Sequence, residues 1–226
     1  MVEAAPPLVR IGILDAGVDL GRLPVAGQAS FTDEGELAPE HGELDHGTAV
    51  AEIVLSRAPQ AAIVSARVFR GRRPASAQVV TAGLEWLIAQ RVHAVNMSFG
   101  LAHDRDALRE TCRAAIEAGV LLVAAAPAAG AMTFPAAYPG VIRVTGDARL
   151  APGELSFLGD SRADFGAAAG GPAHRPHTPG GGASLAAAHF TGELARVMAA
   201  GATGGEVVEL LRRECSYFGR ERRGSR

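Results

Sequence analysis

The pattern of apolar and polar residues along the chain predicts strands that alternate with helices. Residues 9–14 form an apolar run that ends at Asp15, a pattern typical of a buried parallel strand with an acid at its carboxyl end. Residues 46–57 have the composition of a helix, which Ala58-Pro59 would end. The same pattern predicts further strands at 62–68, 93–97, 120–126 and 141–145, and further helices at 76–90, 104–118, 184–200 and 203–215.

Capping residues support two of the predicted helices, and two stretches lack a clear pattern. Asp104 stands where it would cap the helix at 104–118. Thr203 with Glu206 has the spacing of a capping box. Residues 19–43 are rich in glycine, proline and acids and predict a surface loop, whereas 147–179 is rich in turn residues and predicts no defined element.

Strands that alternate with helices predict the α/β fold class. We expect a three-layer α/β/α sandwich, in which helices cover both faces of a mostly parallel sheet. A length of 226 residues suits one domain over 1–226, with loose termini at 1–8 and 216–226. In such a sheet a ligand site lies beyond the carboxyl ends of the strands.

Charge and hydropathy limit the kinds of partner that the protein is expected to bind. The formal charge is −2, so no general field draws the protein to nucleic acid or to an acidic membrane. The arginines at 212–226 lie near the terminus and predict a solvated tail rather than a binding patch. The longest apolar stretch, 120–132, is interrupted by Pro127 and Gly130. Residues 1–8 lack the pattern of a secretory signal, so we expect a cytoplasmic protein without a membrane anchor.

The cysteine and lysine content limits the kinds of catalytic and metal site that the chain can form. Cys112 and Cys215 fall in separate predicted helices without metal-type spacing, so we expect reduced thiols and no bound metal. The chain contains no lysine, which excludes a P-loop lysine, a Schiff base and a Ser-Lys pair. We therefore expect no cofactor.

A serine at a junction between loop and helix is the first candidate for chemistry. Ser184 follows Gly180-Gly181-Gly182 and opens an alanine-rich helix, whose free N–H groups would stabilise an oxyanion. On local grounds alone such a serine is more often an N-cap than a nucleophile. Asp15 and His46 add the other members of a serine triad, in a chain order known for one. His41 is the weaker candidate base, because no helix follows it.

Four motifs, which follow one another along the chain in the family's order, resemble those of the subtilisin-like serine proteases. Three of them lie around the candidate aspartate, histidine and serine, and the other resembles the strand that pairs with substrate. They are Asp15-Ala16-Gly17-Val18-Asp19, His46-Gly47-Thr48, Gly182-Ala183-Ser184-Leu185-Ala186-Ala187-Ala188-His189 and Val95-Asn96-Met97-Ser98-Phe99-Gly100. Together they span the chain from residue 9 to about 200, so the resemblance covers most of it.

The resemblance implies a role for each site residue. Ser184 would attack the scissile carbonyl, His46 would take and return the proton, and Asp15 would orient His46. An extended peptide or protein substrate would pair with Ser98, Phe99 and Gly100. The pocket for the residue before the cut would have a wall made of Ala124, Ala125, Ala126 and Pro127. The backbone N–H of Ser184 would donate to the oxyanion.

The chain also departs from the family pattern. Ala128 stands where the oxyanion-hole asparagine is expected, and its side chain cannot donate a hydrogen bond. The calcium-binding loop usual near the His46 helix is missing, because 54–59 runs directly into the next predicted strand. Two functions therefore stay open. One is a slow or selective serine endopeptidase, such as one that matures a particular peptide; the other is an inactive relative that binds an extended peptide. The sequence does not predict the oligomeric state.

Overall fold

The computed structural model describes residues 8–33, 35–37, 44–70, 75–176 and 182–221. Gly180, Gly181, His41 and, except for Leu8, the predicted loose N-terminus at 1–8 lie outside the described residues. The helices are α1 (Asp45–Arg57), α2 (Ala77–Ala89), α3 (Asp106–Glu117), α4 (Ala183–Ala199) and α5 (Gly205–Arg213). The strands are β1 (Arg10–Asp15), β2 (Gly27–Thr32), β3 (Gly35–Leu37), β4 (Ala62–Arg67), β5 (Ala94–Met97), β6 (Leu121–Ala125), β7 (Ile142–Gly146), β8 (Leu155–Phe157), β9 (Phe165–Ala167) and β10 (Tyr217–Phe218).

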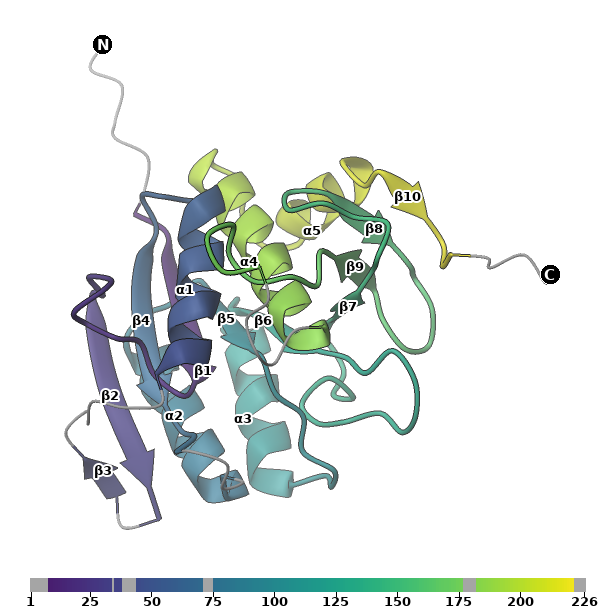
Figure 1. The fold of residues 1–226 in the computed structure, drawn as a ribbon. Coiled ribbons are helices and arrows are strands. Elements are labelled where there is room, and N and C mark those ends of the chain that lie inside the picture. Colours follow the sequence, from purple (N-terminus) through teal and green to yellow (C-terminus); the bar gives the residue numbers. More distant parts are fainter. Residues whose placement is uncertain (1–7, 34, 38–43, 71–74, 177–181, 222–226) are drawn as a thin grey trace.

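The described strands form one twisted sheet in the order β10-β8-β9-β7-β6-β5-β1-β4-β2-β3 (Figure 1). Only the β2–β3 and β8–β9 pairs are antiparallel among these strands. The strand β1 lies inside the sheet, where Leu14 is in register with Ala66 of β4 and with Met97 of β5. Because β1, β4, β5 and β6 are parallel, their carboxyl ends meet at one edge of the sheet.

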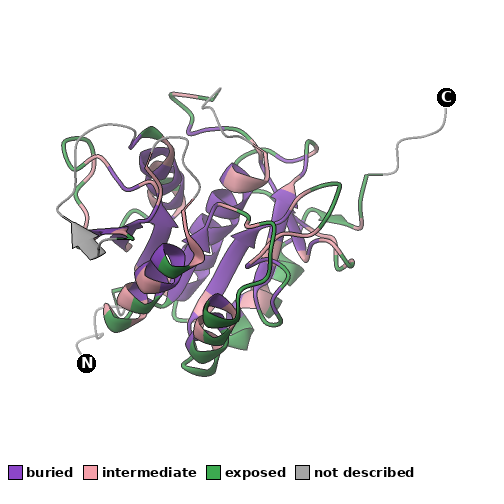
Figure 2. Ribbon diagram, turned by 90° about the horizontal axis from the view of Figure 1, so that it is seen from below, coloured by how far each residue is buried: buried purple, intermediate pink, exposed green. Residues whose placement is uncertain are grey.

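Helices cover both faces of this sheet (Figure 1). The face that buries Ile11 and Ile13 packs against α1, α4 and α5, and the face that buries Leu14 packs against α2 and α3. Figure 2 shows the buried strands between helices whose outer sides are exposed. Successive side chains of β1 point alternately to the two cores, as the two-residue period of a strand requires. The predicted three-layer α/β/α fold is confirmed.

The structure corrects the prediction for the two stretches without a clear pattern. Residues 19–43 are not a loop throughout, since β2 adds a parallel strand beside β4 and β3 follows it. The turn-rich stretch 147–179 contains β8 and β9. These strands have three to six residues and only one or two apolar side chains each, which is too short a run to show a period.

Both predicted caps were also wrong. Arg105 is the N-cap residue of α3, while Asp104 forms an ion pair with Arg109 at 2.6 Å. Gly204 is the N-cap residue of α5, with φ 54°, and no side chain caps the helix, so Thr203 and Glu206 form no capping box. In both cases the backbone conformation at the junction, which the residue types do not reveal, decides where the helix begins.

The C-terminal segment contains the strand β10, which corrects the prediction of a loose terminus at 216–226 for the part that the structure describes. Tyr217 and Phe218 pair with Ser156 and Phe157 of β8, at the edge of the sheet. The ring of Phe157 also packs against that of Phe218, with centroids 6.3 Å apart. Backbone pairing and ring contacts therefore hold a stretch that its charge alone suggested was solvated.

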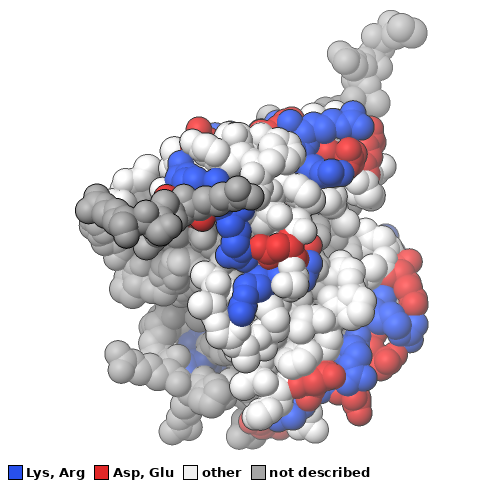
Figure 3. All heavy atoms as spheres, turned by 90° about the vertical axis from the view of Figure 1, so that its right-hand side faces the viewer, with Lys and Arg blue, Asp and Glu red and all other residues white. Residues whose placement is uncertain are grey.

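The surface carries mixed charge. On the face drawn in Figure 3, acidic and basic side chains lie beside one another rather than in patches of one sign. Pairs such as Arg113 with Glu110 and Glu117 on α3 show the same mixing at 2.8 and 2.6 Å. In the part of the chain that the structure describes, every helix is too short or too polar to cross a membrane.

Candidate active site

Three elements bring Asp15, His46 and Ser184 to the same edge of the sheet. Asp15 is the last residue of β1, and its side chain is buried. His46 and Ser184 are each the second residue of a helix, in α1 and α4. The two helices pack side by side on one face of the sheet, and their first turns lie at the carboxyl ends of the strands (Figure 1). The fold thereby brings together Asp15 and His46, which are 31 positions apart in the sequence, and His46 and Ser184, which are 138 positions apart.

The three side chains form a continuous chain of hydrogen bonds. The Nδ1 atom of His46 lies 2.8 and 3.0 Å from the two carboxylate oxygens of Asp15. On the other side of the ring, Nε2 lies 2.7 Å from the hydroxyl oxygen of Ser184. A carboxylate that accepts from Nδ1–H leaves Nε2 as the acceptor for the serine proton. The geometry can therefore move a proton from Ser184 to His46.

The residues after His46 explain why the aspartate can reach it. A Cβ atom on Gly47 would lie 2.1 Å from the carbonyl oxygen of Gly17, so only glycine lets the chain after Asp15 pass so close to α1. The hydroxyl of Thr48 donates to the carbonyl of Leu44 at 2.6 Å and accepts from the N–H of Asp19 at 2.9 Å. The sequence His46-Gly47-Thr48 thus joins the start of α1 to the end of β1.

Two opposing effects act on His46. Burial lowers the pKa of the ring because it disfavours the cation. The charge of Asp15 and its hydrogen bond to Nδ1 raise the pKa, and together they outweigh burial, so the pKa of His46 lies above its usual 6.5. The pair is therefore arranged to stabilise the cation that forms when His46 takes a proton.

Ser184 is not an N-cap. Gly182 occupies that position with φ 84°, a conformation that favours glycine, and the side chain of Ser184 points instead to His46. The N–H groups of the first helical turn stay unpaired within the helix, as at any helix start. The alternative interpretation of Ser184 as a helix cap is therefore wrong.

The structure places Ser98 directly beside Ser184. The hydroxyl of Ser98 donates to the carbonyl of Ser184 at 2.9 Å, and the hydroxyl of Ser184 lies 3.1 Å from the carbonyl of Ser98. Phe99 packs its ring edge to face against Phe69, with centroids 5.1 Å apart. Gly100 is exposed. The predicted substrate segment thus leaves the sheet next to Ser184, the candidate nucleophile.

The residues predicted to form the pocket wall lie on the neighbouring strand. Met97 of β5 is in register with Ala124 of β6, so both segments leave the sheet side by side. The side chains of Ala124, Ala125 and Ala126 are buried in the cores, and Pro127 is half-buried. A wall formed here would be built mainly from main chain.

Ala128 lies in an exposed turn after β6. The guanidinium of Arg162 donates to the carbonyl of Gly130 in the same turn at 2.7 Å. The side chain of Ala128 carries no donor. An oxyanion at Ser184 would need a donor other than that side chain.

Two residues beneath the site escaped the sequence analysis as candidates. Asn96 and Thr191 are fully buried, and they are hydrogen-bonded to each other behind Ser98. The available signal was a polar residue at a position where the surrounding pattern is apolar, inside a buried strand for Asn96 and an alanine-rich helix for Thr191.

Other reactive groups are poorly suited to chemistry. Both cysteines are free and buried, and burial raises the pKa of Cys112 to about 12 and that of Cys215, which also lies near Glu214, to about 11. Neither thiol would ionise near neutral pH. Among the described residues, no group of three or more His, Cys, Asp or Glu side chains could hold a metal ion.

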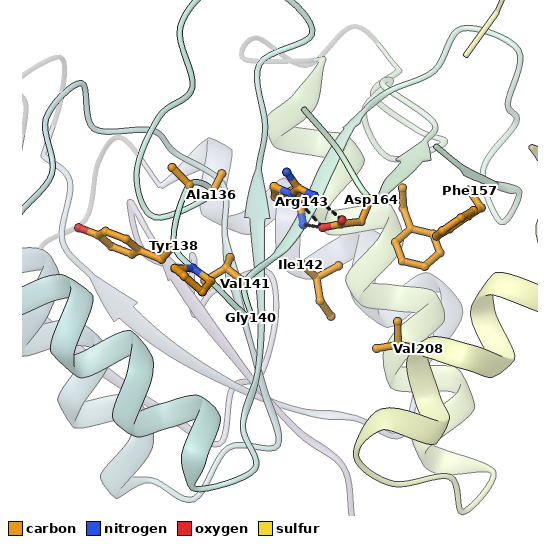
Figure 4. A pocket seen from close by; sticks show the side chains of 12 residues that line it. Ala136, Tyr138, Gly140, Val141, Ile142, Arg143, Phe157, Asp164 and Val208 are labelled. Atoms are coloured by element: carbon orange, nitrogen blue, oxygen red, sulfur yellow. Dashed lines mark hydrogen bonds and ion pairs between the residues drawn. The ribbon is translucent and has the colours of Figure 1, made fainter. Parts of the chain in front are cut away.

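A cavity of about 430 Å³ lies elsewhere in the fold (Figure 4). Ile142 and Phe165, which begin β7 and β9, line it, so it lies toward the edge of the sheet opposite to Ser184. The guanidinium of Arg143 is paired with the carboxylate of Asp164 at 2.6 Å. The cavity contains no free nucleophile or base, and the triad geometry marks the better candidate site.

A serine, a histidine and an aspartate joined in this order, at the carboxyl edge of a parallel sheet, define the class of α/β serine hydrolases. Comparison with protein families gives the particular family. The model of the Subtilase family (Peptidase_S8) matches residues 8–211, which is most of the chain. The chain belongs to the subtilase family of serine peptidases.

Characterised relatives are similar over nearly the whole chain. Subtilisin from Bacillus pumilus is 28% identical, and the match covers 93% of this chain and 85% of the relative. Subtilisin E from Bacillus subtilis is 27% identical over 93% of this chain, but the match covers 61% of the relative. The match thus leaves more than a third of the second relative uncovered.

Solved structures share the fold. The protease domain of PatA, in a serine-to-alanine variant, is 20% identical with a TM-score of 0.61, over 88% of this chain and 82% of that one. Fervidolysin from Fervidobacterium pennivorans, described as a keratinolytic enzyme related to subtilisin, is 23% identical with a TM-score of 0.64. That match covers 86% of this chain and 36% of fervidolysin.

Proposed function

We propose that this protein is a serine endopeptidase in which Asp15, His46 and Ser184 act as the catalytic triad. The observation that carries the proposal is the hydrogen-bond chain from the carboxylate of Asp15 through both ring nitrogens of His46 to the hydroxyl of Ser184. Ser184 attacks the scissile carbonyl while Nε2 of His46 accepts its proton. The same nitrogen then gives the proton to the leaving amine, and water repeats the sequence on the acyl-enzyme.

The oxyanion of the tetrahedral intermediate would form beside the start of α4. The N–H of Ser184 and the partial positive charge of the helix start favour a negative charge at this point. The side chain of Ala128 cannot supply the second hydrogen-bond donor to this oxyanion. Loss of that donor costs about 10²–10³ in kcat, a magnitude measured in subtilisin itself. We therefore expect a slow enzyme, or one whose own substrate supplies the missing interaction.

The proposed substrate is an extended peptide that lies beside Ser184. The main chain of Ser98, Phe99 and Gly100 would pair with the main chain of the substrate, as in β-strand addition. The main chain at Ala124–Pro127 would form the opposite wall of the pocket for the residue before the cut. Such binding suits a peptide or an unfolded segment of a protein, including a precursor that is matured by cleavage.

A second function, binding of an extended peptide without cleavage, is favoured by one observation. The exposed Ala128 provides no side-chain donor for an oxyanion. A binding protein, however, has no physical need for Asp15, His46 and Ser184 to be hydrogen-bonded together. We therefore rank cleavage above binding.

Reaction with a fluorophosphonate tests the proposal. The reagent forms a covalent bond only with an activated serine, and the adduct can be located by peptide mass spectrometry. We expect one adduct, on Ser184, that Ser184→Ala abolishes and His46→Ala slows by several orders of magnitude. A wild-type protein that is folded but takes no label would support the binding function instead.

Two further proposals concern the protein as a whole. We propose that the chain is one catalytic domain, because the sheet runs without interruption from β3 to β10. A cytoplasmic location stays a prediction from the sequence, consistent with the two free thiols.

A further inference from the structure

A row of three buried polar side chains lies directly behind Ser184, the proposed nucleophile. Asn96 belongs to β5, Ser98 to the predicted substrate segment and Thr191 to α4, two turns after Ser184. Asn96 and Thr191 are fully buried, and Ser98 is 9% exposed. Buried polar groups are costly unless each has a partner, so their arrangement is informative.

Hydrogen bonds connect the three side chains to the backbone of Ser184. The amide Nδ2 of Asn96 donates to the hydroxyl of Ser98 at 2.8 Å, and that hydroxyl donates to the carbonyl of Ser184 at 2.9 Å. The hydroxyl of Thr191 lies 3.0 Å from Oδ1 of Asn96 and 2.8 Å from the carbonyl of Ala187. The chain therefore runs from the middle of α4 back to its first turn.

The acceptors fix the direction of every bond. A carbonyl only accepts, so the proton of Ser98 must point to Ser184, and the oxygen of Ser98 must accept from Asn96. The remaining Oδ1 of Asn96 then faces Thr191. The single hydroxyl proton of Thr191 is shared between Oδ1 and the carbonyl of Ala187. Thr191 is thus the donor that keeps the amide of Asn96 in its orientation.

This network joins the nucleophile to the segment that would hold the substrate. The carbonyl of Ser184 is bound by the hydroxyl of Ser98, and the carbonyl of Ser98 lies 3.1 Å from the hydroxyl of Ser184. A shift of one serine therefore moves the other. Because misplacement of a reacting group by about 1 Å can cost 10²-fold in rate, a bond that fixes this distance matters for catalysis.

We propose that Thr191 and Asn96 are positioning residues, which hold Ser98 and the substrate segment in register with Ser184. Neither would touch the substrate. The proposal rests on the proposed peptidase function of Ser184. It predicts that the hydroxyl of Thr191, and not its shape, matters for the site.

Substitution of Thr191 by valine removes the hydroxyl and keeps the shape. Oδ1 of Asn96 then loses its donor in a fully buried site, so the amide and Ser98 lose their fixed orientation. Thr191→Ser returns the hydroxyl. Thr81→Val is a matched control, since the hydroxyl of Thr81 donates to the carbonyl of Ala77 at 2.7 Å inside α2, with the same spacing as Thr191 and Ala187.

Two measurements on the full chain separate positioning from general stability. One is the rate at which a fluorophosphonate labels Ser184, taken well below the melting temperature of each variant. The other is amide hydrogen exchange in the peptide that covers residues 98–101. A role in stability alone would lower the melting temperature of both valine variants and would leave the labelling rate of the folded protein unchanged.

We expect Thr191→Val to label about tenfold more slowly, the scale of one lost buried hydrogen bond, and to exchange faster at 98–101. Thr191→Ser should restore both values, and Thr81→Val should match the wild type in both. A Thr191→Val protein with the wild-type labelling rate would overturn the proposal, whatever its exchange. A wild-type protein that takes no label would contradict the peptidase function. In that case, unchanged hydrogen exchange at 98–101 in Thr191→Val would also overturn the proposed positioning network.

Discussion

In the proposed triad, the ionisation of His46 sets the pH at which Ser184 would react. Only the neutral ring accepts the serine proton, and Asp15 raises the pKa of His46 above 6.5 although burial lowers it. Activity should therefore be low at acidic pH and should rise as the pH passes a midpoint above 6.5. Labelling rates between pH 5 and 9, taken in steps of about half a unit, measure this midpoint.

Asp15→Asn is the control for this pH dependence. It removes the charge that raises the pKa and leaves burial, which lowers it, so the midpoint should fall. The same raised pKa stabilises the protonated fold, a contribution present below pH 6.5 and lost as the pH rises through the folded pKa. A flat profile, or an unchanged midpoint in Asp15→Asn, would contradict a histidine base held by Asp15.

Gly100 illustrates a residue whose importance is steric. A Cβ atom at this position would lie 2.4 Å from the hydroxyl oxygen of Thr133 and 2.7 Å from its Cβ. We expect Gly100→Ala to push the substrate segment away from Thr133, at a cost of about 1–3 kcal/mol to folding, and to lower kcat/KM. The measurements are a urea titration and peptide hydrolysis.

A second substitution shows whether the clash is the cause. All three atoms nearest to that Cβ belong to the side chain of Thr133, so Thr133→Gly should rescue Gly100→Ala. Gly205→Ala is the control for glycine replacement, because no atom lies within 4 Å of its added Cβ. Equal losses with and without Thr133→Gly would show that another contact at Gly100 matters.

Substitutions at Ala128 test the expectation that the enzyme is slow because it lacks an oxyanion donor. If nothing replaces the missing donor, Ala128→Asn should raise kcat by up to about 10²-fold and change KM little, because the bond forms mainly in the transition state. Pro127 fixes φ and lacks an N–H, so Pro127→Gly with Ala128→Asn is the fairer variant. Ala129→Asn, in the same exposed turn, is the control. No gain in the double variant of an active enzyme would indicate that another group already donates to the oxyanion.

At the scale of elements, an ion-pair chain links the helices that carry His46 and Ser184. Glu193 of α4 is 2% exposed and lies between Arg57, in the last turn of α1, and Arg196, which it contacts at 2.6 Å. Arg196 also pairs with Glu214 after α5. The stem of Arg57 packs on Gly192, where an added Cβ would lie 3.1 Å from Cγ of the arginine.

We expect Glu193→Gln to destabilise the fold by about 1–2 kcal/mol, because Arg57 and Arg196, whose side chains are 36% and 37% exposed, lose the charge of the nearly buried carboxylate that they share. Urea denaturation measures the change. Glu209→Gln is the control, since Glu209 is about half exposed, pairs with arginines only on α5 and should cost less than about 0.5 kcal/mol. Equal stability of the two variants would contradict a structural role for the buried carboxylate.

The same scale shows what the sequence could predict. The five helices and the five inner strands β1, β4, β5, β6 and β7 have long or strongly apolar patterns, and all were predicted within a few residues. The short strand β8 lies between turns, and its second residue, Ser156, is a buried serine whose hydroxyl bonds to Asp147 at 2.7 Å. Its burial depends on tertiary contacts, so no local pattern marks it.

For the whole molecule, the parallel sheet explains why the candidate triad could be proposed before the structure was known. Asp15 ends a predicted strand, and His46 and Ser184 begin predicted helices, so one edge of the sheet collects them. The contacts around them could not be predicted in the same way. The approach of Gly47 to the carbonyl of Gly17, and the network of Asn96 and Thr191, depend on how α1 and α4 pack, which is a property of the whole fold.

Cleavage of a peptide library tests the central claim most directly, namely that Asp15, His46 and Ser184 form a working peptidase triad. Peptides derived from a proteome would be incubated with the wild type and with Ser184→Ala, and new termini would be identified by mass spectrometry. Ser184→Ala loses contacts at a half-buried site only, so it should keep its stability within about 1 kcal/mol. The account predicts new termini with the wild type and none with Ser184→Ala. Equal sets of termini from both proteins, or none from a folded wild type at pH 8, would contradict it.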